Sequence, residues 1–291
     1  MNYTKGRVLT LFFANFRFIL LSDCVGKISS KSYRSAAIPQ NATLLTDEHP
    51  WQCGGIPGLG TEFPVLSLNL LQSLGKAQGK CVGVIFVDAK EAFYAILRTL
   101  VVPIYESDQA ICHLLDRLNL PANAMTDLRK LLKQTPVMEE SGLPRPFIDD
   151  VASTYTATHF RVRGTSSIAC AQKGTRPGHP YADVVFAFAF HRILKTLATK
   201  LDALELRPKL PTVDPAEPLI VLGQVTKMPL PVFFDDFIVP IVAKNPTTLL
   251  KDLGRALART AESLANSGMQ VNDKPGKTDI LVDFNGAGEK H

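Results

Sequence analysis

The sequence lacks the paired cysteine and histidine spacings that usually mark zinc sites and disulfide frameworks. Its five cysteines are scattered, odd in number and never form a Cys-x-x-Cys pair, and its six histidines show no His-x-x-x-His spacing. Scattered cysteines of this kind are typical of reduced, mostly buried thiols. The pattern therefore argues against a zinc protein and favours an intracellular protein over a secreted, disulfide-bonded one.

Long uninterrupted apolar runs are also missing. The most apolar stretch near the N-terminus, 8–21, is broken by Asn15 and Arg17, and no small-x-small cleavage site follows it. This stretch is too short and too interrupted to span a membrane. We therefore expect no membrane partner, and a targeting segment stays the alternative interpretation of residues 8–21.

What the chain does contain is enough apolar residues for a core and a small excess of positive charge. It has 291 residues, of which 46% are hydrophobic and 20% are charged, so one large domain or two small ones can form. The net charge of +5 is compatible with a polyanionic partner but does not by itself indicate one.

The expected helices and strands follow one another without regular alternation. Helices are expected at 22–31, 61–78, 107–118, 121–134, 146–158, 183–206 and 246–267, and a helix start at 89–98. Strands are expected at 81–88, in a hairpin over 159–173, in a hairpin around 235–236 and at 279–284. Residues 38–50 and 207–229 are expected to be connections. This order favours an α+β fold, with an antiparallel sheet and helices packed on one face.

Asp235 and Asp236 form a bare pair of acids inside the apolar run 231–241. Adjacent carboxylates are costly in apolar surroundings unless something neutralises them. Like charges this close would push one pKa up, and a bound divalent cation removes this repulsion. Two apolar strands joined by an acidic turn would hold hard oxygen ligands for Mg²⁺ rigidly. The plainer alternative is a solvated hairpin turn, since Asp is common in turns.

A third carboxylate, Asp88, ends the apolar strand expected at 81–88. If this strand pairs beside the acidic hairpin, three carboxylates converge at one sheet edge, which is the arrangement that clamps two metal ions for in-line phosphoryl transfer. The pair Asp149 and Asp150 serves as a contrast. We interpret that pair as structural, because acids suit the start of a helix.

Several motifs surround these acids. Phe86-Val-Asp-Ala-Lys-Glu-Ala-Phe93 places Lys-x-Ala-Phe after the first acid, and Phe233-Phe-Asp-Asp236 places an aromatic and a variable residue before the acidic pair. Gln52-Cys-Gly-Gly-Ile-Pro-Gly-Leu-Gly-Thr61 is a Gln-x-Gly block followed by a loop of small residues. The remaining blocks are 15–27, 174–186 and 268–278, the last with Asn272 and Pro-Gly-Lys277-Thr278.

Together these six blocks, in their order along the chain, resemble a reverse transcriptase of the non-LTR retrotransposon and group II intron type. The blocks extend over almost the whole chain, and each is weak alone. The Gln-Cys-Gly-Gly-Ile-Pro-Gly loop and the Pro-Gly-Lys-Thr segment are similar to retroelement polymerases abundant in dinoflagellate genomes.

The resemblance implies a polymerase palm, an antiparallel sheet backed by helices, with a fingers subdomain and a thumb that is absent or truncated. Residues 1–80 would be part of the fingers, and 81–291 part of the palm with a helical fingers insertion at about 107–160. The implied activity is that of an RNA-directed DNA polymerase, a nucleotidyltransferase. It would extend a DNA primer on an RNA template with dNTPs and two Mg²⁺ ions, with Mn²⁺ as a substitute. The resemblance also implies work in the nucleus.

Residue roles follow from the same resemblance. The metal ligands would be Asp88, Asp235 and Asp236, with Lys277 protonating or neutralising the leaving pyrophosphate. The nucleotide-binding residues would be Arg17 at the triphosphate, Phe93 under the sugar, and Gly174, Arg176 and Gly178 under the nascent base pair. Template or primer phosphates would be contacted, without reading of sequence, by Arg161, Arg163 and Lys173.

The chain departs from the family pattern at several positions. Pro177 stands where a Gln is usual, Ala182-Asp183 stand where Ser-Pro is usual, and no thumb block follows Lys277. These departures support an alternative function, a catalytically inactive remnant that binds RNA or an RNA–DNA duplex. An unrelated metal-dependent nuclease would explain none of the flanking blocks.

Overall fold

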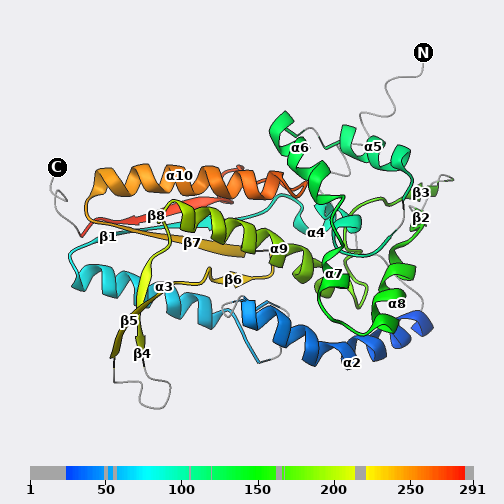
Figure 1. The fold of residues 1–291 in the computed structure, drawn as a ribbon, viewed down its shortest axis with the longest axis horizontal. Helices are drawn as coiled ribbons and strands as arrows, with labels where there is room; N and C mark the ends of the chain where they lie inside the picture. Colours follow the sequence, from blue (N-terminus) through cyan, green and yellow to red (C-terminus); the bar gives the residue numbers. More distant parts are fainter. Residues whose placement is uncertain are drawn as a thin grey trace.

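The computed structural model describes residues 24–48, 52–54, 58–104, 106–118, 120–161, 166, 168–213 and 221–285. At its centre lies a four-stranded antiparallel sheet in the order β6-β7-β1-β8 (Figure 1). Its strands are β6 (Val232–Phe233), β7 (Asp236–Ala243), β1 (Cys81–Val87) and β8 (Asp279–Asp283). The two central strands, β1 and β7, are apolar and almost wholly buried, as expected for strands covered on both faces.

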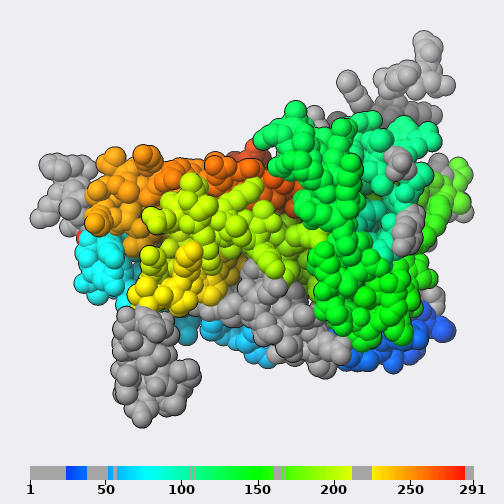
Figure 2. Space-filling model, in the orientation of Figure 1, coloured from blue at the N-terminus to red at the C-terminus, as the bar shows by residue number. Residues whose placement is uncertain are grey.

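Helices cover both faces of this sheet. On one face α9 (Ala182–Ala203) and α10 (Pro246–Ala265) pack together against the buried side chains of Ile85 and Val239. The two helices run side by side along one surface (Figure 2). On the other face α3 (Glu62–Ala77) packs against Val82 and Val84 through Leu71. The α+β expectation of an antiparallel sheet backed by helices is confirmed, and α3 adds a helix on the second face.

The long helix α2 and a group of shorter elements gather at one end of the sheet (Figure 1). They are α2 (Cys24–Glu48), α4 (Ala92–Ala95), η1 (Arg98–Leu100), α5 (Asp108–Asp116), α6 (Ala122–Leu131), α7 (Val137–Glu140), α8 (Arg145–Tyr155), β2 (His159–Arg161) and β3 (Ile168–Cys170). Ser107 caps α5 by accepting the N–H of Ala110, as its residue type predicts. One apolar cluster joins this helical end to the sheet, so both share a continuous core.

Three segments differ from the sequence-based expectation. Residues 38–48, expected to be a connection, continue α2 to Glu48 despite Pro39, a residue that normally ends or kinks a helix. The expected loop 207–229 contains β4 (Lys209–Val213) and β5 (Val221–Lys227), which pair as a separate antiparallel hairpin. The helix start expected at 89–98 is reduced to the short α4 and η1.

Among the helices that the structure describes, none combines the length and apolar character needed to cross a bilayer.

Candidate active site

The acidic pair stands at the tip of a tight hairpin. Strands β6 and β7 pair Val232 with Phe237 and Phe233 with Asp236, which leaves a two-residue turn of Phe234 and Asp235. Phe234 has a φ of 59°, a left-handed conformation that is unfavourable for a bulky residue. The hairpin predicted around these acids is therefore present, with Asp235 in the turn and Asp236 as the first residue of β7.

The register of the sheet brings Asp88 to the same place. Strand β1 pairs with β7 from Cys81 opposite Ala243 to Val87 opposite Phe237. The next residues along the two strands are Asp88 and Asp236, so antiparallel pairing alone makes them neighbours. Asp236 is exposed at the start of β7. Its pKa is nevertheless raised above its usual value, chiefly by partial desolvation and then by the charge of Asp88, while Lys277 opposes the shift.

The segment after α10 folds back onto Asp88. Lys277 Nζ lies 3.1 Å from Asp88 Oδ2, and the side-chain amide of Asn272 donates to Asp88 Oδ1 at 3.3 Å. The main-chain N–H of Asn272 donates to the Asp88 carbonyl at 2.8 Å, and the N–H of Asp88 donates to Thr278 Oγ1 at 3.2 Å. Asn272 and Thr278 were part of a sequence block without an assigned role, and here they fix the position of Asp88.

The predicted metal ligands are chemically suitable, but their side chains do not form a complete coordination site in this structure. Carboxylate oxygens are the donors that Mg²⁺ prefers. In the part of the chain that the structure describes, no three Asp, Glu, His or Cys side chains converge closely enough to hold a metal ion. Asp88 and Asp236 are brought together, Asp235 stands half-buried in the adjoining turn, and the Lys277 ammonium neutralises Asp88. The donors fit the ion, and binding would require their side chains to reorient.

The segment Gln52–Gly54 supports the acidic hairpin from outside the sheet. Gln52 forms an isolated parallel bridge with Val232, and the N–H of Cys53 donates to the Val232 carbonyl at 2.8 Å. A Cβ atom on Gly54 would lie 2.1 Å from the main-chain nitrogen of Phe234. This contact explains why the Gln-x-Gly block has glycine at this position.

Phe93 lies between two of the predicted blocks. Its ring stacks on Phe186 of α9, with centroids 4.2 Å apart and planes 17° apart. It is also 6.4 Å, centroid to centroid, from the ring of Phe234 in the acidic turn. The half-buried Phe93 ring is thereby held between α9 and the acidic hairpin.

The loop 174–178 attaches directly to the chain around Phe93. The N–H groups of Gly174 and Thr175 donate to the carbonyls of Ile96 and Phe93 at 2.8 and 2.7 Å. Gly174 has a φ of 87°, and an added Cβ would lie 3.0 Å from Tyr94 Cα, so both its conformation and its surroundings require glycine. The structure thus brings Gly174 next to Phe93, and nucleotide binding by the two residues stays a prediction.

The other predicted nucleotide and phosphate contacts are less close to the acids. Arg176 donates through Nη1 to the Thr154 carbonyl at 2.7 Å, which holds its guanidinium toward α8, and Gly178 is exposed. Lys173 is exposed directly before Gly174. Arg161 is the last residue of β2, although its side chain is not described, and Arg17 and Arg163 lie outside the described residues.

The contrasting pair Asp149 and Asp150 bonds to other side chains of the fold, but the predicted explanation, a favourable place at a helix start, does not apply. Because α8 begins at Arg145, neither acid lies in its first turn, so the helix-dipole explanation is wrong. Asp149 pairs with Arg145 at 2.8 Å, and Asp150 accepts a hydrogen bond from the Tyr181 hydroxyl.

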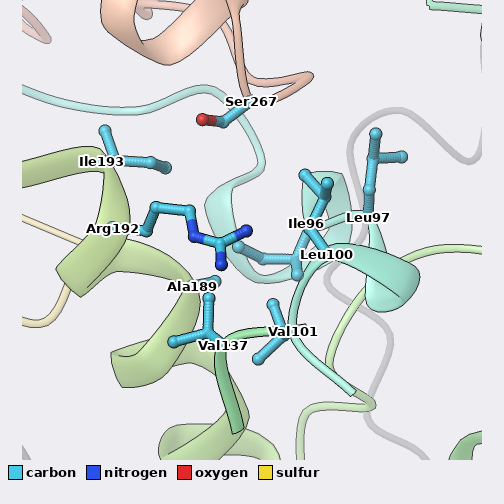
Figure 3. Close-up of a pocket in the computed structure, with 9 residues that line it drawn as sticks. All are labelled: Ile96, Leu97, Leu100, Val101, Val137, Ala189, Arg192, Ile193 and Ser267. Atoms are coloured by element: carbon cyan, nitrogen blue, oxygen red, sulfur yellow. The ribbon is translucent and has the colours of Figure 1, made fainter. Parts of the chain in front are cut away.

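A cavity of about 20 Å³ lies elsewhere, between α9, α7 and the chain around η1 (Figure 3). It is lined by Ile96, Leu97, Leu100, Val101, Val137, Ala189, Arg192, Ile193 and Ser267. This volume is enough for about one water molecule and far too small for a nucleotide. The candidate site is therefore the end of the sheet where Asp88 and Asp236 meet, and not this cavity.

Comparisons with known proteins add little to this geometry. No protein family and no curated protein matches the chain. Among solved structures, apo telomerase from Candida tropicalis, truncated from its C-terminal domain, is similar with a TM-score of 0.46 and 14% sequence identity. That alignment covers 99% of this chain and 45% of the telomerase chain, so this chain spans less than half the length of that neighbour. A likeness at this level carries no argument about function.

Proposed function

We propose that this chain is a reverse-transcriptase domain, an RNA-directed DNA polymerase of the non-LTR retroelement type that adds deoxynucleotides to a primer 3′ end. One observation carries the proposal: Asp88, Asp236 and Lys277, from three distant sequence blocks, meet at one end of an antiparallel sheet. In this proposal 81–291 is the palm with a helical fingers insertion at about 107–160, and 1–80 belongs to the fingers. The enzyme would act in the nucleus.

The acidic residues would hold the catalytic metals. Asp88, Asp235 and Asp236 would bind two Mg²⁺ ions, or Mn²⁺ in their place, which would activate the 3′ hydroxyl and stabilise the leaving pyrophosphate. Desolvation, and then the charge of Asp88, raise the pKa of Asp236. The second of these contributions supports the assignment, because a bound cation relieves repulsion between neighbouring carboxylates. Lys277, at 3.1 Å from Asp88, would restrain that carboxylate and neutralise negative charge on the leaving group.

The nucleotide would lie on the surface formed by Phe93 and the loop 174–178. Phe93 would pack under the sugar, and its stack on Phe186 supports a rigid position for this ring. Gly174, Arg176 and Gly178 would lie under the nascent base pair, and Arg17 would contact the triphosphate. The phosphates of the template and primer would be contacted by Arg161, Arg163 and Lys173.

Primer extension on poly(rA)/oligo(dT) with Mg²⁺ or Mn²⁺ tests the proposal. Wild type should extend the primer, and D235N and D236N should each lose more than about 100-fold, because even partners that only orient metal ligands are worth 10–100-fold. The matched control is D149N, which alters an exposed acid of the other Asp-Asp pair and should leave extension unchanged. Extension that survives in D236N would falsify the assignment.

A second candidate is a remnant that binds RNA or an RNA–DNA duplex without catalysis. It is favoured by the absence of a three-residue metal cluster in the described part of the chain and by the Lys277–Asp88 ion pair. Two more observations favour this candidate. Arg176 already donates to the Thr154 carbonyl, and Pro177 stands where a Gln is usual. A folded wild type that binds the duplex in a salt-dependent manner, yet incorporates no dNTP with either metal, would establish this candidate. Incorporation that D236N abolishes would exclude it.

A further inference from the structure

Arg98, in η1, is a buried charge that forms no ion pair among the described residues. Its exposed fraction is 2%, and its guanidinium donates instead to main-chain carbonyls. Nε donates to the Gly174 carbonyl at 2.7 Å, and Nη1 donates to those of Ala171 and Tyr155 at 2.5 and 3.3 Å. The guanidinium carbon also lies 5.2 Å from the centroid of the Tyr155 ring.

The Glu106 carboxylate attracts this guanidinium without forming an ion pair with it, so hydrogen bonds to main-chain carbonyls must offset most of the cost of burying the charge. Burial lowers the pKa of Arg98 to about 10, so the side chain still carries its charge at neutral pH. An apolar side chain of similar volume would fill the same space without this desolvation penalty. The charge is therefore explained by the main-chain carbonyls that accept its hydrogen bonds. Two of them belong to Ala171, just before the loop 174–178, and to Gly174, its first residue.

That loop has a conformation which needs external support. Gly174 and Arg176 both have positive φ values, 87° and 53°, and the second is unfavourable for a residue with a side chain. On one side the N–H of Thr175 is bonded to the Phe93 carbonyl at 2.7 Å. On the other side Arg98 holds the Gly174 carbonyl, and the Tyr155 hydroxyl donates to the Thr175 carbonyl at 2.6 Å.

We propose that Arg98 is a positioning residue that fixes the segment 171–176 against Phe93 and thereby sets the surface on which the incoming nucleotide lies. The proposal rests on the proposed polymerase function. Arg98 touches no substrate in this arrangement, because its donors are directed at main-chain carbonyls. Lysine at this position would keep the charge but lose the planar fork of donors that reaches separate acceptors.

Hydrogen exchange tests whether Arg98 fixes the segment 171–176, and it requires no enzymatic activity. In R98K and R98M the amides of Gly174 and Thr175 should exchange at least about tenfold faster than in wild type, because local opening becomes easier. Amides of β1 and α10 should be unchanged. The control R207M removes another largely buried arginine, which pairs with Asp202, and should leave the loop amides protected. Unchanged protection of Gly174 and Thr175 in both Arg98 variants would overturn the proposal.

Steady-state kinetics test whether this segment in turn positions the incoming nucleotide. R98K should raise the KM for dNTP about tenfold or more while kcat changes less than about threefold. A displaced loop weakens nucleotide binding equally in the ground state and the transition state, so the chemical step itself is little affected. A fall in kcat at unchanged KM, or an equal effect in R207M, would contradict a positioning role. If wild type itself shows no extension, the proposed function fails, whereas the exchange experiment still decides whether Arg98 holds the loop.

Discussion

His179 is a buried titratable group next to the candidate nucleotide loop. It lies between Gly178 and α9, and its Nδ1 accepts the main-chain N–H of Tyr181 at 3.3 Å, as expected for a polar core residue. Burial, and then the positive charge of Arg176, lower its pKa to about 4, while Asp150 opposes the shift. The neutral form of His179 is therefore the one that fits the folded state.

The sign of the resulting pH effect follows from linkage. Because the folded-state pKa of about 4 lies below the usual 6.5, the unfolded chain takes up a proton first as the pH falls. The contribution of His179 to stability should be complete above pH 6.5 and decline by up to about 3 kcal/mol toward pH 4. Urea unfolding at pH 7 and 4.5 should show a smaller fall in unfolding free energy for H179Q than for wild type. The control H113Q changes an exposed histidine, and a decline in H179Q equal to that of wild type would refute the account.

At the scale of elements, the acidic hairpin depends on a close contact with Gln52–Gly54. In G54A the new Cβ would lie 2.1 Å from the Phe234 nitrogen, a main-chain atom that cannot simply rotate away. We expect G54A to lose about 1–3 kcal/mol of unfolding free energy, a typical penalty for overpacking, and to impair primer extension. The matched control is G254A in α10, where nothing lies within 4 Å and alanine should be neutral or stabilise by up to about 1 kcal/mol. Equal stabilities of the two variants, measured by urea unfolding, would show that the contact is unimportant.

The elements also show which parts of the fold a sequence can predict. The apolar strand ending at Asp88 and the hairpin at Asp235 were predictable, because their apolar runs agree with the buried strands β1 and β7 that they form. The β4–β5 hairpin was not, because the proline-rich segment 207–229 reads locally as a loop. Its strands form through pairing with each other and through burial of Leu210 and Met228 against the sheet.

The orientation of α3 shows the same limit of local patterns. The helical spacing of its apolar residues predicts one shared buried face, made of Phe63, Leu66, Leu70, Leu71 and Leu74. In the structure Leu71 is buried with Pro64, Ser67 and Gly75, while Phe63, Leu66 and Leu70 remain exposed. The helix packs so close to β1 that a Cβ on Gly75 would lie 2.2 Å from Val82. Small residues therefore define the contact, and hydrophobic periodicity does not detect them.

At the scale of the whole molecule, the site exists only because distant segments fold together. The order of the sequence blocks predicted that Asp88, Asp236 and Lys277 belong to one site. In the structure Asp88 continues β1 beside the start of β7 and pairs with Lys277, and the role of these residues as a metal site stays a prediction. The carbonyl acceptors of Arg98 and the support of Phe234 by Gly54 carry no local signal, since both depend on main-chain atoms far away in sequence.

The net charge of +5 leads to a prediction about duplex binding by the whole molecule. If Lys173 contacts a backbone phosphate, K173A should weaken binding of an RNA–DNA duplex equally for different base sequences, because phosphates carry no sequence information. It should also reduce the slope of log affinity against log salt by about one, the share of a single phosphate contact. Fluorescence anisotropy between about 50 and 200 mM KCl measures this slope. K251A, at an exposed position on α10, should leave the slope at the wild-type value. A slope that K173A leaves unchanged, or a loss that depends on base sequence, would remove Lys173 from the nucleic-acid interface.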